Sequence, residues 1–182
     1  WMLTYESSEV IVNSNYMKGE LQKLFGLPYE KINVVPNGVN LSLFNGIERD
    51  YNFRRKYAMD NEKIILFMGR LVYEKGIQHL ISAMPKILQG YQDSKLVICG
   101  KGGMIDELRQ QVDRMGISDK VYFAGYMKGK DVQRMYKAAD VAVFPSTYEP
   151  FGIVALEAML SEKPIVVSDI GGLNEIVEHK VN

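Results

Sequence analysis

The sequence predicts an α/β protein built on a doubly wound, parallel, Rossmann-like sheet, and three observations support this. From about Lys63 onward, short apolar runs alternate with amphipathic helical patterns. The alternation is long enough for successive βαβ units with right-handed crossovers. The chain has 182 residues, of which 47% are hydrophobic and 24% charged, so it can hold one such domain and part of another.

The apolar runs are short and unbroken, which is typical of strands that are buried on both faces of a parallel sheet. Five strands are expected, at Ile64–Met68, Leu96–Cys99, Val121–Ala124, Val141–Phe144 and Ile165–Val167. The segments between them favour helices because apolar residues recur on one helical face. These helices are expected at Ile77–Leu88, Ile105–Met115, Val132–Ala139 and Ile153–Leu160. Pro85 should bend the first of them, and a last helix is expected after Gly171-Gly172.

The first forty-odd residues follow a different pattern. Val10–Val12 and Ile32–Val35 are expected to be strands, and Ser14–Phe25 a helix that starts at its serine. Pro36-Asn37-Gly38 then breaks the chain with turn residues. We therefore expect residues 1–45 to be the remnant of a preceding domain with its hinge, and residues 46–182 to be a second domain that is incomplete at its C-terminus. The ends at Trp1 and Asn182 suggest a fragment truncated at both ends.

Composition excludes several classes of protein. The 22 basic and 22 acidic residues cancel, which argues against a nonspecific nucleic-acid binder. Cys99 is the single cysteine, so no internal disulfide forms, and a reducing, cytoplasmic location is favoured. No apolar run approaches the roughly 20 residues that span a bilayer. The two histidines, His79 and His179, are far apart in the sequence and no D-x-D occurs, so no metal site is expected.

In a doubly wound sheet, ligands bind beyond the carboxyl ends of the first and fourth strands, where the strand order reverses. The loop after the first strand, Gly69–Gly76, carries Arg70 and Lys75 next to a helix start. A guanidinium fork, an ammonium group and unpaired helix amides suit phosphate oxygens. The alternative is that both cations are solvated surface residues.

The loop after the fourth strand, Pro145–Gly152, carries a second group of polar residues. Glu149 lies ahead of the helix and Glu157 two turns inside it, so both can face one ligand. Gly152 allows close approach to the helix N-terminus, which favours negative charge. The alternative is that Glu149 only complements the helix dipole and Glu157 is a surface carboxylate. Together, the two loops offer cations for a diphosphate and carboxylates for sugar hydroxyls, and a nucleotide sugar has both parts.

Four segments, "VPNGVN", "GRLVYEKG", "PSTYEPFGIVALEAM" and "GGLNEIV", resemble in order and spacing the signature of the group-1 (family 4) retaining glycosyltransferases of GT-B fold. The resemblance covers essentially the whole chain. It implies that Arg70 and Lys75 hold the donor diphosphate, that Glu157 binds the ribose and that Glu149 contacts the transferred sugar. By the same resemblance, the amides of Gly152 and Ile153 help to bind the diphosphate–sugar portion. Backbone around Met127 is expected to meet the base.

The resemblance makes residues 46–182 the nucleotide-sugar donor-binding domain and residues 1–45 the remnant of the acceptor domain. It implies a hexosyl-type transferase that needs no cofactor or metal and acts with retention on an acceptor glycan, lipid or small molecule. The catalytic candidates are Arg70, Lys75 and Glu149. The parent would be cytoplasmic, with peripheral membrane association left open, and this fragment alone would be inactive. A non-catalytic nucleotide-binding module and a related GT-B epimerase are the alternatives, while no motif favours a phosphorylase.

The sequence departs from this family at two positions inside the chain. Asn40 stands where the family often has aspartate, and Glu162 where glycine is common at a helix end. Two glycine-rich segments each allow two interpretations. The loop Gly100-Lys101-Gly102-Gly103 either lines the nucleotide cleft or is a plain turn, and it lacks the G-x-G-x-x-G spacing of a nicotinamide site. Gly171-Gly172 either lies near the sugar or forms a turn. His79 is expected in solvent and Cys99 in the core.

Overall fold

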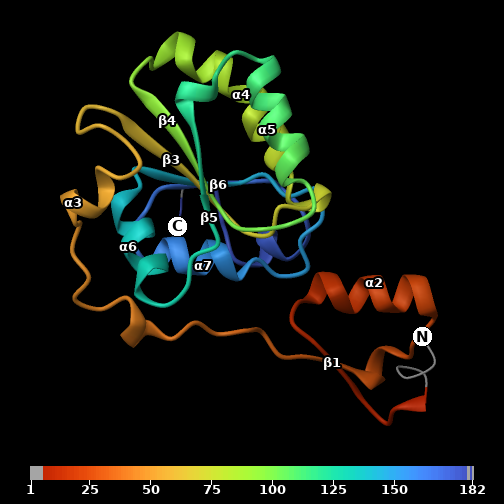
Figure 1. Cartoon of the computed structure of the whole chain (residues 1–182). Coiled ribbons are helices and arrows are strands. Elements are labelled where there is room, and N and C mark those ends of the chain that lie inside the picture. Colours follow the sequence, from red (N-terminus) through yellow and green to blue (C-terminus); the bar gives the residue numbers. More distant parts are fainter. Residues whose placement is uncertain (1–5, 180, 182) are drawn as a thin grey trace.

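The chain folds into a five-stranded parallel sheet with helices on both faces and a smaller unit beside it (Figure 1). The computed structural model describes residues 6–179 and 181. In this part of the chain, no helix combines the length and the apolar character needed to cross a membrane.

The smaller unit is built from residues near the N-terminus. Strands β1 (Val10–Val12) and β2 (Ile32–Val34) pair in parallel, and helix α2 (Asn15–Phe25) connects them, followed by the short 3-10 helix η1 (Tyr29–Lys31). Ser14 is the N-cap of α2, and its hydroxyl accepts a hydrogen bond from the third helical amide at 3.1 Å. The predicted strand, helix and strand are therefore confirmed.

A long connection leads from this unit to the main sheet and contains η2 (Leu41–Leu43) and α3 (Tyr51–Arg54) (Figure 1). Asn40 precedes η2, and its side-chain oxygen accepts hydrogen bonds from the amide and the hydroxyl of Ser42, at 3.0 and 2.7 Å. An amide oxygen thus caps this turn as a carboxylate would. The departure from aspartate at this position is therefore structurally conservative.

The main sheet confirms the predicted fold class and all five predicted strands to within about two residues at each end. Its members, in chain order, are β3 (Lys63–Met68), β4 (Ser94–Cys99), β5 (Val121–Gly125), β6 (Val141–Phe144) and β7 (Ile165–Val167). They lie in the order β5-β4-β3-β6-β7, all parallel. The first and fourth strands of the sheet, β3 and β6, are therefore neighbours, and the strand order reverses between them.

Four helices connect these strands: α4 (Ile77–Gly90), α5 (Ile105–Arg114), α6 (Lys130–Ala138) and α7 (Ile153–Leu160), with short 3-10 helices η3 (Tyr73–Lys75) and η4 (Ser118–Lys120). Helix α4 continues through Pro85 rather than ending there. The helix expected after Gly171-Gly172 is only a short 3-10 helix, η5 (Gly171–Glu175), so that prediction was wrong in type.

The strand pleat sends alternate side chains to two separate cores. Ile65 and Phe67 of β3 pack with α4 and α5 on one face, whereas Ile64 and Leu66 pack with α3, α6 and α7 on the other. Cys99 is buried in the second core, as expected, and burial raises the pKa of its thiol to about 12. Two covered faces explain why the strands are unbroken apolar runs.

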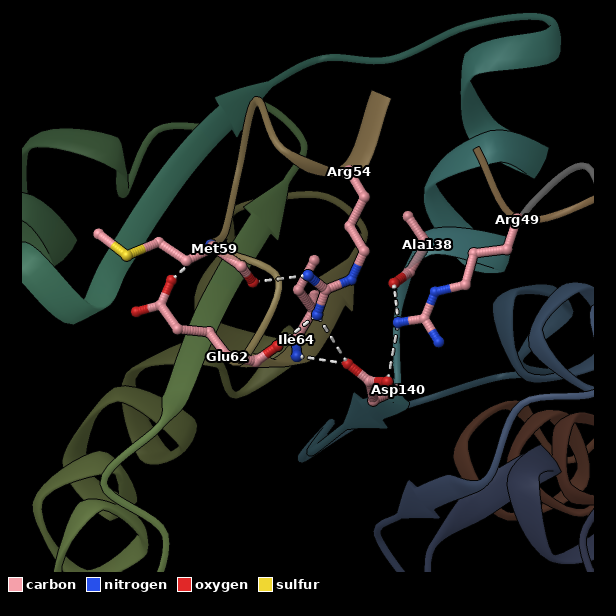
Figure 2. A network of polar contacts seen from close by, with 7 residues as sticks. All are labelled: Arg49, Arg54, Met59, Glu62, Ile64, Ala138 and Asp140. Atoms are coloured by element: carbon pink, nitrogen blue, oxygen red, sulfur yellow. Dashed lines mark hydrogen bonds and ion pairs between the residues drawn. The ribbon is translucent and has the colours of Figure 1, made fainter. Parts of the chain in front are cut away.

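A polar network fixes the connecting segment to the edge of the sheet opposite the strands' carboxyl ends (Figure 2). The carboxylate of Asp140 accepts hydrogen bonds from the Ile64 amide at 2.8 Å, from Arg49 at 2.9 Å and from the buried Arg54 at 3.2 Å. Arg54 also donates to the carbonyl oxygens of Met59 and Glu62. Burial raises the pKa of Asp140, but these hydrogen bonds outweigh it and leave the pKa below its ordinary value.

The turn after α7 holds a glutamate in a conformation that favours glycine. Glu162 has a φ of 57°, and it is the one non-glycine residue with positive φ in the described ranges, 6–179 and 181. Its carboxylate lies 3.1 Å from Lys137 Nζ. The departure from glycine at this position therefore places a side chain in the left-handed region.

Candidate functional site

The two loops that the sequence singled out meet beyond the carboxyl ends of β3 and β6. The carbonyl oxygen of Glu74, in the first loop, accepts hydrogen bonds from the amides of Thr147 and Tyr148, in the second, at 2.8 and 3.3 Å. Backbone hydrogen bonds thus hold the loops together, independently of any side chain. The site is therefore located where the strand order reverses.

A glycine allows the loops to come this close. Gly76 ends η3 and precedes α4 with a φ of 68°, and a Cβ atom there would lie 1.8 Å from the carbonyl oxygen of Pro145. No side chain fits at that distance, so this position requires glycine on both steric and conformational grounds.

Lys75 and Glu149 form an ion pair across the two loops. Lys75 Nζ lies 2.6 Å from Glu149 Oε2, and the side chains are only 17% and 8% exposed. The hydroxyl of Ser146 donates to the same carboxylate oxygen at 3.3 Å. The sequence analysis assigned Lys75 to the diphosphate and Glu149 to the sugar as separate groups, whereas in the structure the two side chains are in direct contact. Because both charges are largely withdrawn from water, each depends on the other for compensation.

Arg70 is held far less tightly. Its side chain is 70% exposed, and Nη2 lies 3.5 Å from Glu74 Oε1 on the following turn. An exposed pair at this distance contributes little to stability, so the guanidinium can change partners at small cost. Arg70 is therefore a mobile cation beside the fixed ion pair.

Two cavities lie side by side at this edge of the sheet. The Glu157 cavity has a volume of about 290 Å³ and is also lined by Met127. The Glu149 cavity has a volume of about 240 Å³ and is also lined by Lys75. Arg70 lines both cavities. The predicted residues, which come from distant parts of the sequence, thus line two adjoining cavities.

The N-terminus of α7 borders the Glu149 cavity. Ile153, the first helical residue, lines the cavity, and Gly152 precedes it with a φ of 103°. A Cβ at Gly152 would lie 2.6 Å from a methyl group of Leu173. No side chain in the described ranges caps α7, so its first amides are not satisfied by a capping group. Of the predicted pair, Ile153 therefore lies in the cavity wall, with the positive end of a helix dipole, and Gly152 directly precedes it in the chain.

Glu157 projects from α7 and is held by a residue that the sequence analysis missed. The fully buried Tyr136 of α6 donates a hydrogen bond from its hydroxyl to Glu157 Oε2 at 3.0 Å, with the Val154 carbonyl oxygen at 3.3 Å. Burial raises the pKa of Glu157, and the hydrogen bond from Tyr136 opposes that rise. The helical pattern of α6 contained the signal, because position 136 follows Val132 by one turn on its apolar face.

The glycine-rich loop after β4 lines the Glu157 cavity rather than forming a plain turn away from it. Gly100 and Lys101 both lie in the cavity wall, together with Tyr126. The ammonium group of Lys101 lies 4.9 Å from the centre of the Tyr126 ring, a geometry typical of a cation–π contact. The cavity wall therefore combines an aromatic ring, a cation and Met127.

Gly171 and Gly172 support the loop that carries Glu149. The Gly172 amide donates to the Glu149 carbonyl oxygen at 2.9 Å. Cβ atoms at these glycines would lie 2.3 Å from the Glu149 carbonyl oxygen and 2.4 Å from that of Pro150. The pair is thus a close backbone contact behind the loop, and glycine is required there.

Over residues 6–179 and 181, no group of three or more histidine, cysteine, aspartate or glutamate side chains could hold a metal ion. His79 is exposed on α4, as expected.

The chain is similar to known proteins over its whole length. A family model described as glycosyl transferases group 1 matches residues 49–182, and one described as glycosyltransferase family 4 matches residues 1–43. The chain is 48% identical to an uncharacterized glycosyltransferase of Methanocaldococcus jannaschii over its whole length, and 34% identical to glycogen synthase of Mycobacterium tuberculosis over 96% of its length. It spans 47% and 41% of these relatives, which is less than half of each.

Solved structures are similar over the same extent. The crystal structure of Anabaena HepE in complex with UDP and glucose matches with a TM-score of 0.85 and 30% identity, over 97% of this chain and 48% of HepE. The structure of HepE with UDP-glucose matches with a TM-score of 0.84 and 31% identity, over 97% of this chain and 49% of HepE.

Proposed function

The chain belongs to the glycosyl transferases group 1 family, and from this premise we propose that it binds a nucleoside-diphosphate sugar and supplies the donor side of a sugar transfer to an acceptor hydroxyl. One observation carries the proposal. Arg70, Lys75, Glu149 and Glu157 converge on two adjoining cavities at the edge where a doubly wound sheet binds its ligands. The complexes of HepE with UDP and with UDP-glucose support the assignment of donor type.

The nucleoside is assigned to the Glu157 cavity. Tyr136 occupies one oxygen of Glu157, which leaves the other to accept a hydrogen bond from a ribose hydroxyl. Met127 lies in the wall of the same cavity, and we propose that the backbone around it meets the base. A carboxylate toward the ribose and backbone groups toward the base would give affinity for nucleosides in general.

The diphosphate is assigned to the boundary between the cavities. Arg70 lines both, Lys75 lies on one side, and Ile153, at the uncapped N-terminus of α7, lines the Glu149 cavity. All three groups favour negative charge, and Lys75 is largely shielded from water, so together they would stabilise the charge that develops on a departing diphosphate. We propose that they perform this task without a metal ion or any other cofactor.

The transferred sugar is assigned to the Glu149 cavity. Glu149 is held by Lys75 and Ser146, so its carboxylate has a fixed position before the donor arrives. As the bond from the sugar to the diphosphate breaks, positive character develops at the anomeric carbon, and a nearby carboxylate stabilises it. We propose retention of configuration, with a donor phosphate oxygen accepting the proton of the acceptor hydroxyl on the same face.

The acceptor is assigned to the side of residues 1–45, with residues 46–182 as the donor side. The chain spans less than half of the first relatives it matches, so the transfer itself is a proposal for the full-length protein. A glycan, a lipid or a small molecule with a free hydroxyl would each suit the chemistry.

The test is a donor panel on the full-length protein. Calorimetry with UDP, GDP and ADP should show binding of at least one nucleoside diphosphate, and the matching nucleotide sugar should be consumed with an acceptor. Product NMR should show the same anomeric configuration as the donor.

Two lysine variants test the location of the site. Lys75→Ala should weaken binding of the nucleoside diphosphate, whereas Lys86→Ala, on the solvent side of α4, should leave it unchanged. Equal binding by both variants would contradict the proposed site.

A further inference from the structure

Helix α2 receives part of its N-terminal cap from a residue 160 positions away in the sequence. Its first turn contains no acidic side chain, although the first amides of a helix favour a negative partner. Ser14 satisfies the Met17 amide from within the smaller unit. The amides of Asn15 and Tyr16 remain for another acceptor.

Glu175, in η5, supplies that acceptor with both of its carboxylate oxygens. Oε2 accepts from the Asn15 backbone amide and from its side-chain amide, each at 2.9 Å, and Oε1 accepts from the Tyr16 amide at 2.7 Å. Burial raises the pKa of Glu175, but the two backbone hydrogen bonds outweigh it, and the pKa lies below its ordinary value. The carboxylate is thus ionised and directed at the helix terminus.

The same contact region adjoins the loop that carries Glu149. The Ser14 hydroxyl donates to the Pro150 carbonyl oxygen at 2.5 Å. The rings of Tyr16 and Tyr148 meet edge to face, with centroids 6.1 Å apart. The Gly172 amide of η5 also donates a hydrogen bond to this loop, at the Glu149 carbonyl oxygen. A shift of α2 would therefore displace the backbone of Pro150, which is one residue from Glu149.

This contact joins two parts of the chain that different family models match, residues 1–43 and residues 49–182. The covalent link between them is the long connection seen in Figure 1. Glu175 and Asn15 are exposed, and exposed charged contacts are individually weak. A contact of this kind can break and re-form, unlike the buried pair of Lys75 and Glu149.

We infer that Glu175 is a positioning residue: by capping α2 across the boundary, it holds the acceptor side of the protein against the Glu149 loop. It touches neither donor nor reacting atoms. The role of Glu175 in transfer rests on the proposed function. The capping contact, and its effect on the distance between α2 and the main sheet, do not.

The test uses full-length protein labelled for distance measurement through Lys23→Cys, on α2, and Gln110→Cys, on α5. Cys99 is buried, and any cysteine outside residues 1–182 is replaced by serine. Glu175→Gln removes the charge at nearly constant shape, and Asn15→Asp opposes it with a like charge. Glu107→Gln, an exposed glutamate of α5, is the matched control. Both test variants should lengthen or broaden the distance between labels, and the control should not.

The same variants should keep their affinity for nucleoside diphosphate within about twofold, because the donor cavities are untouched, and lose transfer by about tenfold or more, because reacting groups are misplaced. An unchanged label distance in both variants would overturn the inference. A changed distance with wild-type transfer would overturn the positioning role. Failure of the unaltered protein to bind any nucleoside diphosphate would instead refute the proposed function, and the distance measurement would still decide the capping contact.

Discussion

Replacing Tyr136 with phenylalanine removes one hydroxyl from the interior and leaves the ring in place. That hydroxyl is the donor to Glu157 at 3.0 Å, in a side chain with no exposed surface. The ring still fills its space, so the substitution creates no cavity that would add to the loss of stability. Loss of a buried hydrogen bond to a charged group costs on the order of 1.5–3 kcal/mol of unfolding free energy, and we expect a loss in this range at neutral pH.

The loss should depend on pH with a definite sign. Burial already raises the pKa of Glu157 above its ordinary 4.5, and Tyr136 partly opposes that rise. Without the hydroxyl, the pKa of Glu157 rises further. A carboxyl group with a raised pKa in the folded state destabilises the fold when ionised and ceases to do so as the pH falls through that pKa. The difference between variant and wild type should therefore shrink on acidification.

Urea unfolding at neutral pH and at a pH near the ordinary pKa of glutamate measures this difference. Other carboxyl groups titrate in both proteins, so their effects cancel in the comparison. Tyr57→Phe is the control, since Tyr57 is partly buried and packs against Phe53 and Tyr122. A loss that is equal at both pH values, or no greater than that of the control, would refute the account of how Glu157 is held.

Two further predictions concern the loop cations and the turn after α7. Arg70→Ala and Lys75→Ala should each weaken nucleoside-diphosphate binding by on the order of 1.5–3 kcal/mol in calorimetry. Only Lys75→Ala should also lower the melting temperature, because it leaves the buried Glu149 unpaired. Binding that vanishes with chelator and returns with magnesium would contradict the metal-free assignment. Glu162→Gly should be more stable than Glu162→Ala by about 1 kcal/mol in urea unfolding, since both lose the contact with Lys137 and only glycine relieves the positive φ. Equal stability of these two variants would show that the turn is unstrained.

The sheet could be predicted closely because each strand is buried on both faces, so its sequence is a short apolar run with clear ends. The helix Ile153–Leu160 was predicted at its observed bounds for a similar reason. The site could be located because the carboxyl ends of parallel strands meet at one edge. That rule predicts from the sequence that Arg70, Lys75, Glu149 and Glu157 lie together, and the structure places all four in the walls of the two cavities.

Pairings between side chains could not be predicted in this way. The ion pair of Lys75 and Glu149, the hydrogen bond from Tyr136 to Glu157 and the cap that Glu175 supplies to α2 all join residues from different elements. Such contacts depend on how elements pack: the periodicity of α6 places Tyr136 on its apolar face, but it does not identify Glu157 as the partner. The final helix was predicted in error because the residues after Gly172 form only a short 3-10 turn.

The central claim is that the two carboxylates act on different parts of the donor, and one comparison tests it most directly. In the full-length protein, Glu157→Ala and Glu149→Gln are measured side by side by calorimetry with the bare nucleoside diphosphate and by steady-state transfer. Glu157→Ala should raise the Kd for the diphosphate, because the ribose contact is lost.

Glu149→Gln keeps a neutral hydrogen-bond acceptor beside Lys75 and removes the negative charge near the sugar. It should leave diphosphate affinity within about threefold and lower turnover by ~10²-fold or more, as expected for one positioned electrostatic group. Equal loss of diphosphate affinity in the two variants would contradict the account, because both carboxylates would then serve only to shape the cleft.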